Sequence, residues 1–131
     1  MSVGLLIIGH NGVGPALLGT ATLVLGGECP LEAKVISATR ESEPEEMLEH
    51  MKMLIEELDE GDGVLILTDL LGSTPTNIAQ RLLPAPKIRI VAGINLGMLL
   101  NVLNYPSLDL AELVKKAVAG GRGGVLEIGD P

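Results

Sequence analysis

Short runs of consecutive apolar residues alternate along the chain with longer segments in which apolar residues recur every three or four positions. Runs of the first kind are typical of strands covered on both faces, and the second spacing is typical of amphipathic helices. The regular alternation favours an α/β fold, a doubly wound and mostly parallel sheet. We predict strands at 3–8, 33–38, 63–68, 87–92 and 124–128.

Capping residues, prolines and glycines indicate where the intervening helices begin and end. Ser42 with Glu45, and Asp109 with Glu112, have the spacing of a capping box. Thr74 suits an N-cap because the proline that follows it is favoured at the first helical position. The predicted helices run from Pro15 to Leu25, Pro44 to Leu58, Pro75 to Leu83, within 93–103, and from Asp109 to Gly120–Gly121.

Composition narrows the class of protein. The 131 residues contain no Phe or Trp and one Tyr, so aliphatic side chains and methionine must build the core of a single domain. Nine basic residues against 17 acidic ones give a net charge of −8, which disfavours binding to nucleic acid or to an anionic membrane surface.

The single cysteine and the absence of recognisable targeting signals favour a cytoplasmic location. The lone Cys29 forms no intrachain disulfide, which fits a reducing compartment. The first residues lack the basic segment of a signal peptide, and no apolar run reaches the ~18 residues of a membrane-spanning helix. We therefore expect a cytoplasmic protein without direct membrane insertion.

The candidate site consists of polar residues that follow the predicted strands. His10 follows the first strand and Asp69 the third. In a flavodoxin-like strand order these two strands are neighbours, and ligands bind outside their carboxyl ends. A carboxylate that bonds one ring N–H fixes the imidazole tautomer and leaves the other nitrogen free to attack. No serine or cysteine nucleophile accompanies the pair, so we assign the nucleophile to His10.

A possible anion site lies just beyond Asp69. Gly72 allows close backbone approach, and the hydroxyls of Ser73 and Thr74 could face a dianion together with free N–H groups of Thr76 and Asn77. Taken alone, this segment is an ordinary helix start. Its placement beside a histidine nucleophile fits a phosphoryl group, whose charge the N–H groups and hydroxyls would meet.

Other interpretations fit less well. The segment GHNGVG does not match a dinucleotide-binding fingerprint in register. A receiver domain also carries an aspartate after its third strand, but it needs an acidic pair to hold Mg²⁺ where this chain has Gly9–His10. We therefore expect no metal and no cofactor. Asn11 and Asn95 are possible loop contacts, although Asn95 could simply cap a helix, and His50 is expected to be exposed and inert.

Four segments together resemble a known family: LLIIGH, GVLILTDLLGSTPTN, VAGINLGMLL and GRGGV. The chain resembles the IIA component of the mannose family of the bacterial phosphoenolpyruvate-dependent sugar phosphotransferase system. The resemblance implies that His10 accepts a phosphoryl group from the phosphocarrier protein HPr, that Asp69 orients it, and that Thr74 binds the phosphoryl oxygens. It also implies a homodimer in which an antiparallel last strand, here 124–128, is exchanged between subunits.

Two residues depart from the family pattern. Asn11 stands where the family usually has glycine, although asparagine tolerates left-handed backbone, and Ser73 stands where a second glycine is common. We expect a single IIA domain over 1–131 with no attached IIB domain, so that a separate IIB protein receives the phosphoryl group. The predicted function is that of a cytoplasmic phosphotransferase in sugar transport. The alternatives are a regulatory phosphoprotein, in which phosphorylation of His10 controls partner binding, and a simple anion-binding module.

Overall fold

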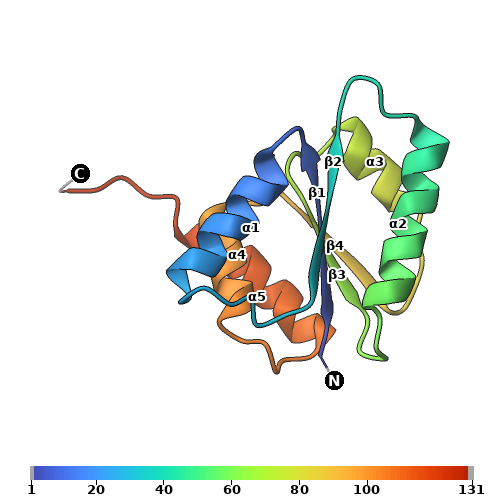
Figure 1. Ribbon diagram of the computed structural model, residues 1–131. Coiled ribbons are helices and arrows are strands. Elements are labelled where there is room, and N and C mark those ends of the chain that lie inside the picture. Colours follow the sequence, from blue (N-terminus) through green and yellow to red (C-terminus); the bar gives the residue numbers. More distant parts are fainter. Residues whose placement is uncertain (1, 130–131) are drawn as a thin grey trace.

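Parallel strands form the sheet of the computed structural model, which describes residues 2–129 (Figure 1). The strands are β1 (Gly4–His10), β2 (Ala33–Ala38), β3 (Val64–Thr68) and β4 (Ile88–Ala92). Their order is β2-β1-β3-β4, and every pairing is parallel. The register sets His10 beside Ala38 and Ile8 beside Thr68, so β1, β2 and β3 end at the same edge. The predicted doubly wound sheet with β1 next to β3 is confirmed.

Helices cover both faces of this sheet (Figure 1). They are α1 (Val13–Val24), α2 (Pro44–Leu58), α3 (Thr74–Gln80), α4 (Leu96–Leu103) and α5 (Leu110–Gly123). Helices α1, α4 and α5 pack on one face, and α2 and α3 pack on the other. Among the described residues, no helix is both long enough and apolar enough to cross a membrane.

Alternate residues of the central strands fill the two cores. Leu5 and Ile7 of β1 point into the core beneath α1, α4 and α5, while Leu6 and Ile8 point into the core beneath α2 and α3. All four are fully buried. Because both faces of the sheet are covered, apolar residues are favoured at nearly every position of these strands, which explains the uninterrupted runs in the sequence.

The start of α2 differs from the prediction. The N-cap is Glu43, whose carboxylate accepts a hydrogen bond from the Glu46 N–H at 3.0 Å. The predicted cap, Ser42, instead accepts the N–H of Thr39 through its hydroxyl at 2.9 Å. A short hydroxyl side chain can bond several nearby N–H groups, and here it closes the turn before the helix rather than the helix itself.

Other helix boundaries shift by a few residues. Thr74 is the first residue of α3 and Ser73 is its N-cap, and the helix ends at Gln80, short of the predicted Leu83. The Arg81 N–H bonds the carbonyl three residues back at 3.0 Å, a tightened turn common at helix ends. The predicted cap of α5 is confirmed, because the Asp109 carboxylate accepts the Glu112 N–H at 2.9 Å. Helix α1 begins two residues before Pro15, at Val13, and α5 continues beyond Gly121, to Gly123.

The strand predicted at 124–128 is not formed. This segment has no regular secondary structure and extends away from the body of the molecule (Figure 1). Its apolar side chains are exposed: Val125 by 78%, Leu126 by 69% and Ile128 by 94%. A strand needs a neighbouring strand to accept and donate its backbone hydrogen bonds, and none adjoins this segment within residues 2–129.

Candidate functional site

The carboxyl end of β1 delivers His10 to the edge of the sheet. His10 is the last residue of the strand, and its side chain is 45% exposed. The chain then turns sharply at Asn11, whose φ of +49° lies in the left-handed region and whose N–H donates to the Ala38 carbonyl at 2.8 Å. Glycine and asparagine adopt this conformation at least cost. Asn11 therefore makes the same turn that a glycine would make.

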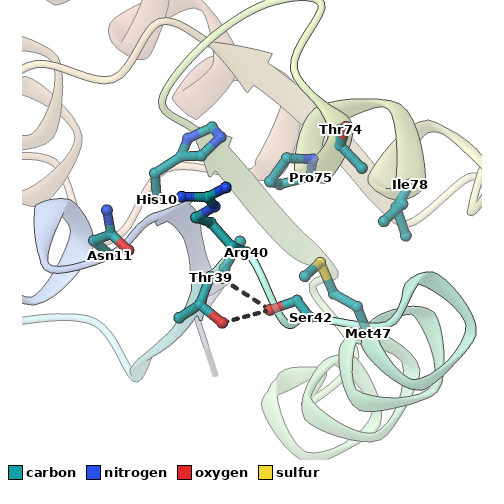
Figure 2. A pocket seen from close by; sticks show the side chains of 10 residues that line it. His10, Asn11, Thr39, Arg40, Ser42, Met47, Thr74, Pro75 and Ile78 are labelled. Carbon is teal, nitrogen blue, oxygen red and sulfur yellow. Dashed lines mark hydrogen bonds between the residues drawn. The ribbon is translucent and has the colours of Figure 1, made fainter.

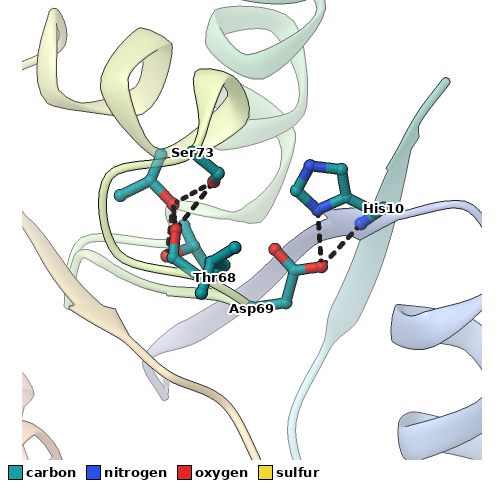
Figure 3. Close-up of polar contacts among 6 residues, drawn as sticks. His10, Thr68, Asp69 and Ser73 are labelled. Carbon is teal, nitrogen blue, oxygen red and sulfur yellow. Dashed lines mark hydrogen bonds and ion pairs between the residues drawn. The ribbon is translucent and has the colours of Figure 1, made fainter. Parts of the chain in front are cut away.

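Asp69 holds His10 at two points (Figure 3). Its Oδ2 accepts the backbone N–H of His10 at 2.8 Å and lies 2.9 Å from the ring Nδ1. A Cβ added at Gly9 would come within 3.3 Å of the same Oδ2, so the glycine leaves the carboxylate room to approach. With the carboxylate ionised, Nδ1 carries the ring proton and Nε2 carries the free lone pair.

The environment of Asp69 favours its charged form. Burial by itself would raise the pKa of this carboxyl group, but the hydrogen bonds from the backbone and ring of His10 outweigh it and lower the pKa. Its side chain is only 12% exposed, and Oδ1 is buried without a hydrogen-bond partner among the described residues. A desolvated, ionised carboxylate beside the ring would stabilise positive charge that develops on the imidazole.

Several residues that we predicted to bind the anion form hydrogen bonds within the segment that follows Asp69. The buried Thr76 hydroxyl lies 2.9 Å from the Thr68 hydroxyl and 2.8 Å from the Leu70 carbonyl, and the Ser73 hydroxyl donates to that carbonyl at 2.7 Å (Figure 3). The N–H of Asn77, expected to be free, donates to the Ser73 carbonyl at 2.9 Å. The Thr76 hydroxyl and the Asn77 N–H are therefore occupied by bonds within this segment, and the expectation of a free N–H is wrong for Asn77.

Thr74 and His10 line one shared cavity of about 310 Å³ (Figure 2). The backbone N–H groups of Thr74 and Thr76 donate to no acceptor within residues 2–129. Gly72 adopts a φ of +85°, which allows the chain to turn toward this helix start. Of the predicted anion ligands, Thr74 is thus the side chain placed in the cavity with the histidine.

Sequence reasoning missed the opposite wall of this cavity, which comes from the end of β2 and from α2. Its lining residues are Ala38, Thr39, Arg40, Ser42 and Met47, whereas Pro75 and Ile78 of α3 add to the wall formed by Thr74. Arg40 is the only lysine or arginine among them. A signal for it exists, because it follows the second strand just as His10 and Asp69 end or follow the first and third.

Asn95 lies outside this cavity and acts as the cap of α4. Its side-chain oxygen accepts the Met98 N–H at 2.8 Å, and its amide nitrogen donates to the Gly121 carbonyl at 3.1 Å. Of the two uses open to Asn95 in the sequence, the structure shows the cap. The described residues contain no group of three or more metal-binding side chains.

The sequence is similar to proteins of a known family. Residues 4–118 match the EIIA-man family, described as "PTS system fructose IIA component". The chain is 32% identical over 130 residues to the "PTS system mannose-specific EIIAB component" of Escherichia coli K12, covering 95% of this chain and 39% of that relative. It therefore spans well under half the length of the curated relative that it matches.

Solved structures share the fold. The mannose/sorbose specific IIA subunit of a phosphotransferase system from Enterococcus faecalis is 27% identical with a TM-score of 0.86, covering 100% of this chain and 98% of that one. A sigma-54 interaction domain protein from the same organism is 16% identical with a TM-score of 0.74, covering 93% and 92% of the two chains. The second likeness concerns the fold alone.

Proposed function

The chain belongs to the EIIA-man family of phosphotransferase-system IIA components, and from this premise we propose that it is a phosphocarrier whose His10 accepts and passes on a phosphoryl group. The observation that carries the proposal is the double contact between Asp69 Oδ2 and His10. It fixes the backbone and ring of the same residue and leaves Nε2 as the nucleophile. The donor would be phospho-HPr and the acceptor a IIB protein.

The proposed transfer needs no separate base, because the attacking nitrogen of His10 already carries a free lone pair. The lone pair of His10 Nε2 attacks phosphorus, a new N–P bond forms, and the N–P bond of the donor phosphohistidine breaks. Its electron pair returns to the donor ring nitrogen. The His10 ring, still protonated at Nδ1, then carries positive charge beside the ionised Asp69. Asp69 thereby stabilises the phosphorylated state electrostatically, and transfer to the acceptor reverses these steps.

Thr74 is the group we propose for the phosphoryl oxygens. Its side chain lines the same cavity as His10, and its backbone N–H has no acceptor within the described chain. Hydroxyl and amide donors fixed before the reaction can meet the charge of a transferring phosphoryl group without reorganising. Ser73 would contribute indirectly, because its hydroxyl holds the loop through the Leu70 carbonyl.

We extend the proposal to a homodimer that exchanges residues 124–128. Their exposed Val125, Leu126 and Ile128 would be covered if the segment paired with the sheet of a second copy. Light scattering of the full chain, compared with a chain ending at Gly123, measures this. A monomeric full chain would contradict the exchange while leaving the phosphoryl chemistry of His10 intact.

The decisive experiment labels the protein with phosphoenolpyruvate, enzyme I and HPr. The wild-type protein is expected to acquire phosphate that is acid-labile and alkali-stable, as a phosphohistidine is, whereas His10→Ala remains unlabelled. His50→Ala is the matched control, since His50 is an exposed histidine on α2, and it should label like the wild type. Equal labelling of wild type and His10→Ala would refute the assignment.

A further inference from the structure

Arg40 supplies a positive charge to the cavity that His10 occupies. It lies two residues beyond the end of β2, and the register places that end directly beside His10. Figure 2 shows its guanidinium group turned toward the His10 ring, with Thr74 and Pro75 across the cavity. Among the described residues on the walls of this cavity, Arg40 is thus the one lysine or arginine.

The turn that carries Arg40 is fixed by its own hydrogen bonds. The Ser42 hydroxyl accepts the Thr39 N–H at 2.9 Å, and the Ser42 N–H donates to the Thr39 carbonyl at 3.2 Å. These two bonds close the chain around Arg40 and Glu41, and α2 begins immediately afterwards, at Pro44. The arginine therefore projects from a constrained turn between two regular elements.

No carboxylate neutralises Arg40 within the part of the chain that the structure describes. Ion pairs with acidic side chains involve Lys34, Lys52, Arg81 and Lys115, and Arg40 is not among them. In a chain with a net charge of −8, an arginine left unpaired beside a nucleophile has a specific use open to it. Its planar fork matches the oxygens of a phosphoryl group, which it can bind with two parallel hydrogen bonds.

A cation in this cavity would reduce the electrostatic repulsion between a phosphoryl group on His10 and the carboxylate of Asp69. A phosphoryl group on His10 Nε2 would bring negative charge into a site that already holds the ionised, largely buried Asp69. Two like charges so close repel each other, and the positive charge on the ring offsets only one of them. A second cation on the opposite wall of the cavity would relieve the remaining repulsion.

We propose that Arg40 binds the phosphoryl group carried by His10 and stabilises its dianionic form, a role that rests on the proposed phosphocarrier function. The ligand class is a protein-bound phosphoryl group on an imidazole nitrogen. Thr74 contacts it from α3 and Arg40 from the turn after β2. The phosphoryl group is thereby held between α3 and the turn that follows β2.

The test compares Arg40→Gln and Arg40→Lys with the wild type and with Arg89→Gln. Arg89 is also exposed and without an ion pair among the described residues, but it lies near the start of β4, away from the carboxyl edge. One measurement is the rate of labelling by phospho-HPr at limiting and saturating donor. The other is the pH midpoint of the ³¹P resonance of the isolated phosphoprotein, which reports the second ionisation of the phosphoryl group.

Arg40→Gln is expected to lower the saturating rate about tenfold and to change KM less than twofold, because a charge-assisted, two-pronged contact is lost. The ³¹P midpoint should rise, since the dianion loses its cation. Arg40→Lys should restore the ³¹P midpoint in part and the labelling rate to a smaller extent. Lysine keeps the positive charge but cannot form the two parallel hydrogen bonds of a guanidinium group. Arg89→Gln should match the wild type in both measurements.

Two results would overturn the role of Arg40 while leaving the proposed function standing. One is an Arg40→Gln protein identical to the wild type in rate and midpoint. The other is a change in KM alone with an unmoved midpoint, which would place Arg40 against the donor protein instead. A wild-type protein that takes no label, or label that persists in His10→Ala, would instead overturn the proposed function and the role of Arg40 with it.

Discussion

Two aspartates mark the two ends of β3. Asp59 precedes the strand, and one of its carboxylate oxygens accepts the N–H groups of Gly61 at 2.8 Å and Gly63 at 3.0 Å. Asp69 follows the strand and accepts the backbone N–H of His10 at 2.8 Å while facing its ring at 2.9 Å. Each carboxylate bonds two groups through one oxygen, but Asp59 bonds only backbone, whereas Asp69 bonds a half-exposed ring that can react.

The packing of glycines differs in the same way between the two ends. At the amino end, a Cβ on Gly4 would lie 2.7 Å from both the Cβ and the carbonyl oxygen of Leu58, and one on Gly63 would lie 2.7 Å from the Lys87 carbonyl. At the carboxyl end, a Cβ on Gly12 or Gly72 would meet nothing within 4 Å. The amino end is closed by packing, and the carboxyl end leaves space in front of the histidine.

Neutralising the aspartate at each end of β3 should give the largest difference in the rate of phosphoryl acceptance. Asp69→Asn is expected to slow phosphoryl acceptance about 100-fold, because an amide cannot stabilise the positive ring or enforce its tautomer. Asp59→Asn should accept phosphate within about twofold of the wild type, since its role is confined to a turn. Initial labelling rates measure both. Similar rates for the two variants would show that Asp69, too, is only structural.

Replacing a glycine by alanine at each end should affect different properties. At the amino end we expect mainly a lower free energy of unfolding, and at the carboxyl end mainly slower phosphoryl transfer. Gly4→Ala is expected to lower the free energy of unfolding by about 2 kcal/mol, because the added carbon overlaps the backbone of Leu58. The tightest contact of a Cβ at Gly9 would be with Asp69 Oδ2, at 3.3 Å, and its contacts with Asp69 Cγ at 3.5 Å and the Gly14 nitrogen at 3.6 Å would be ordinary ones. Gly9→Ala should therefore cost about 1 kcal/mol or less in stability while slowing transfer about tenfold by displacing the carboxylate.

Urea titration and the labelling rate report the two effects separately. Unfolding free energies that fall equally in both variants would remove the distinction between a packed end and an open end. An unchanged transfer rate in Gly9→Ala would mean that the position of Asp69 tolerates displacement, and it would weaken the case for close contact with the ring.

The smallest expected effect is on acid stability. Hydrogen bonds from Gly61 and Gly63 lower the pKa of Asp59, and those from His10 lower the pKa of Asp69 despite its burial, both from an ordinary value of 3.8. A carboxyl group with a lower pKa in the folded state binds fewer protons there than when unfolded. Its contribution is complete above the unfolded pKa and is lost as the pH falls through the folded one.

The free energy of unfolding should therefore stay level above about pH 5 and decline below about pH 4. Replacing both residues, in Asp59→Asn/Asp69→Asn, should flatten this decline by about 1 kcal/mol. Chemical denaturation at successive pH values provides the measurement. An acid limb as steep in the double variant as in the wild type would show that other carboxylates cause it.

Much of the fold followed from the apolar pattern, because a buried position must be apolar whatever its neighbours are. The runs around Leu5–Ile8 and Val64–Leu67 identified central strands, and their alternation with helices predicted a doubly wound parallel sheet, for which we expected a flavodoxin-like strand order. That order alone brought His10 and Asp69 to one edge. The left-handed turn at Asn11 was likewise compatible with its residue type.

Hydrogen-bond partners were less predictable, because several polar residues near one helix start can each satisfy the same groups. Ser42 closes a turn instead of capping α2, and the hydroxyl of Thr76 and the N–H of Asn77 bond their own loop. Residue type shows only that a hydroxyl or amide can form such bonds. Which bond forms depends on distances of a few tenths of an ångström.

The sequence by itself determined the order of elements, the parallel sheet and the placement of His10 and Asp69 at the ends of strands, since these depend on which positions are apolar and where strands end. Only the tertiary structure decided what else surrounds the histidine. It placed Arg40 on the facing wall of the cavity and left residues 124–128 without a strand to pair with. Such outcomes depend on contacts between segments distant in sequence, so a local pattern can place Arg40 after a strand but not against the His10 cavity.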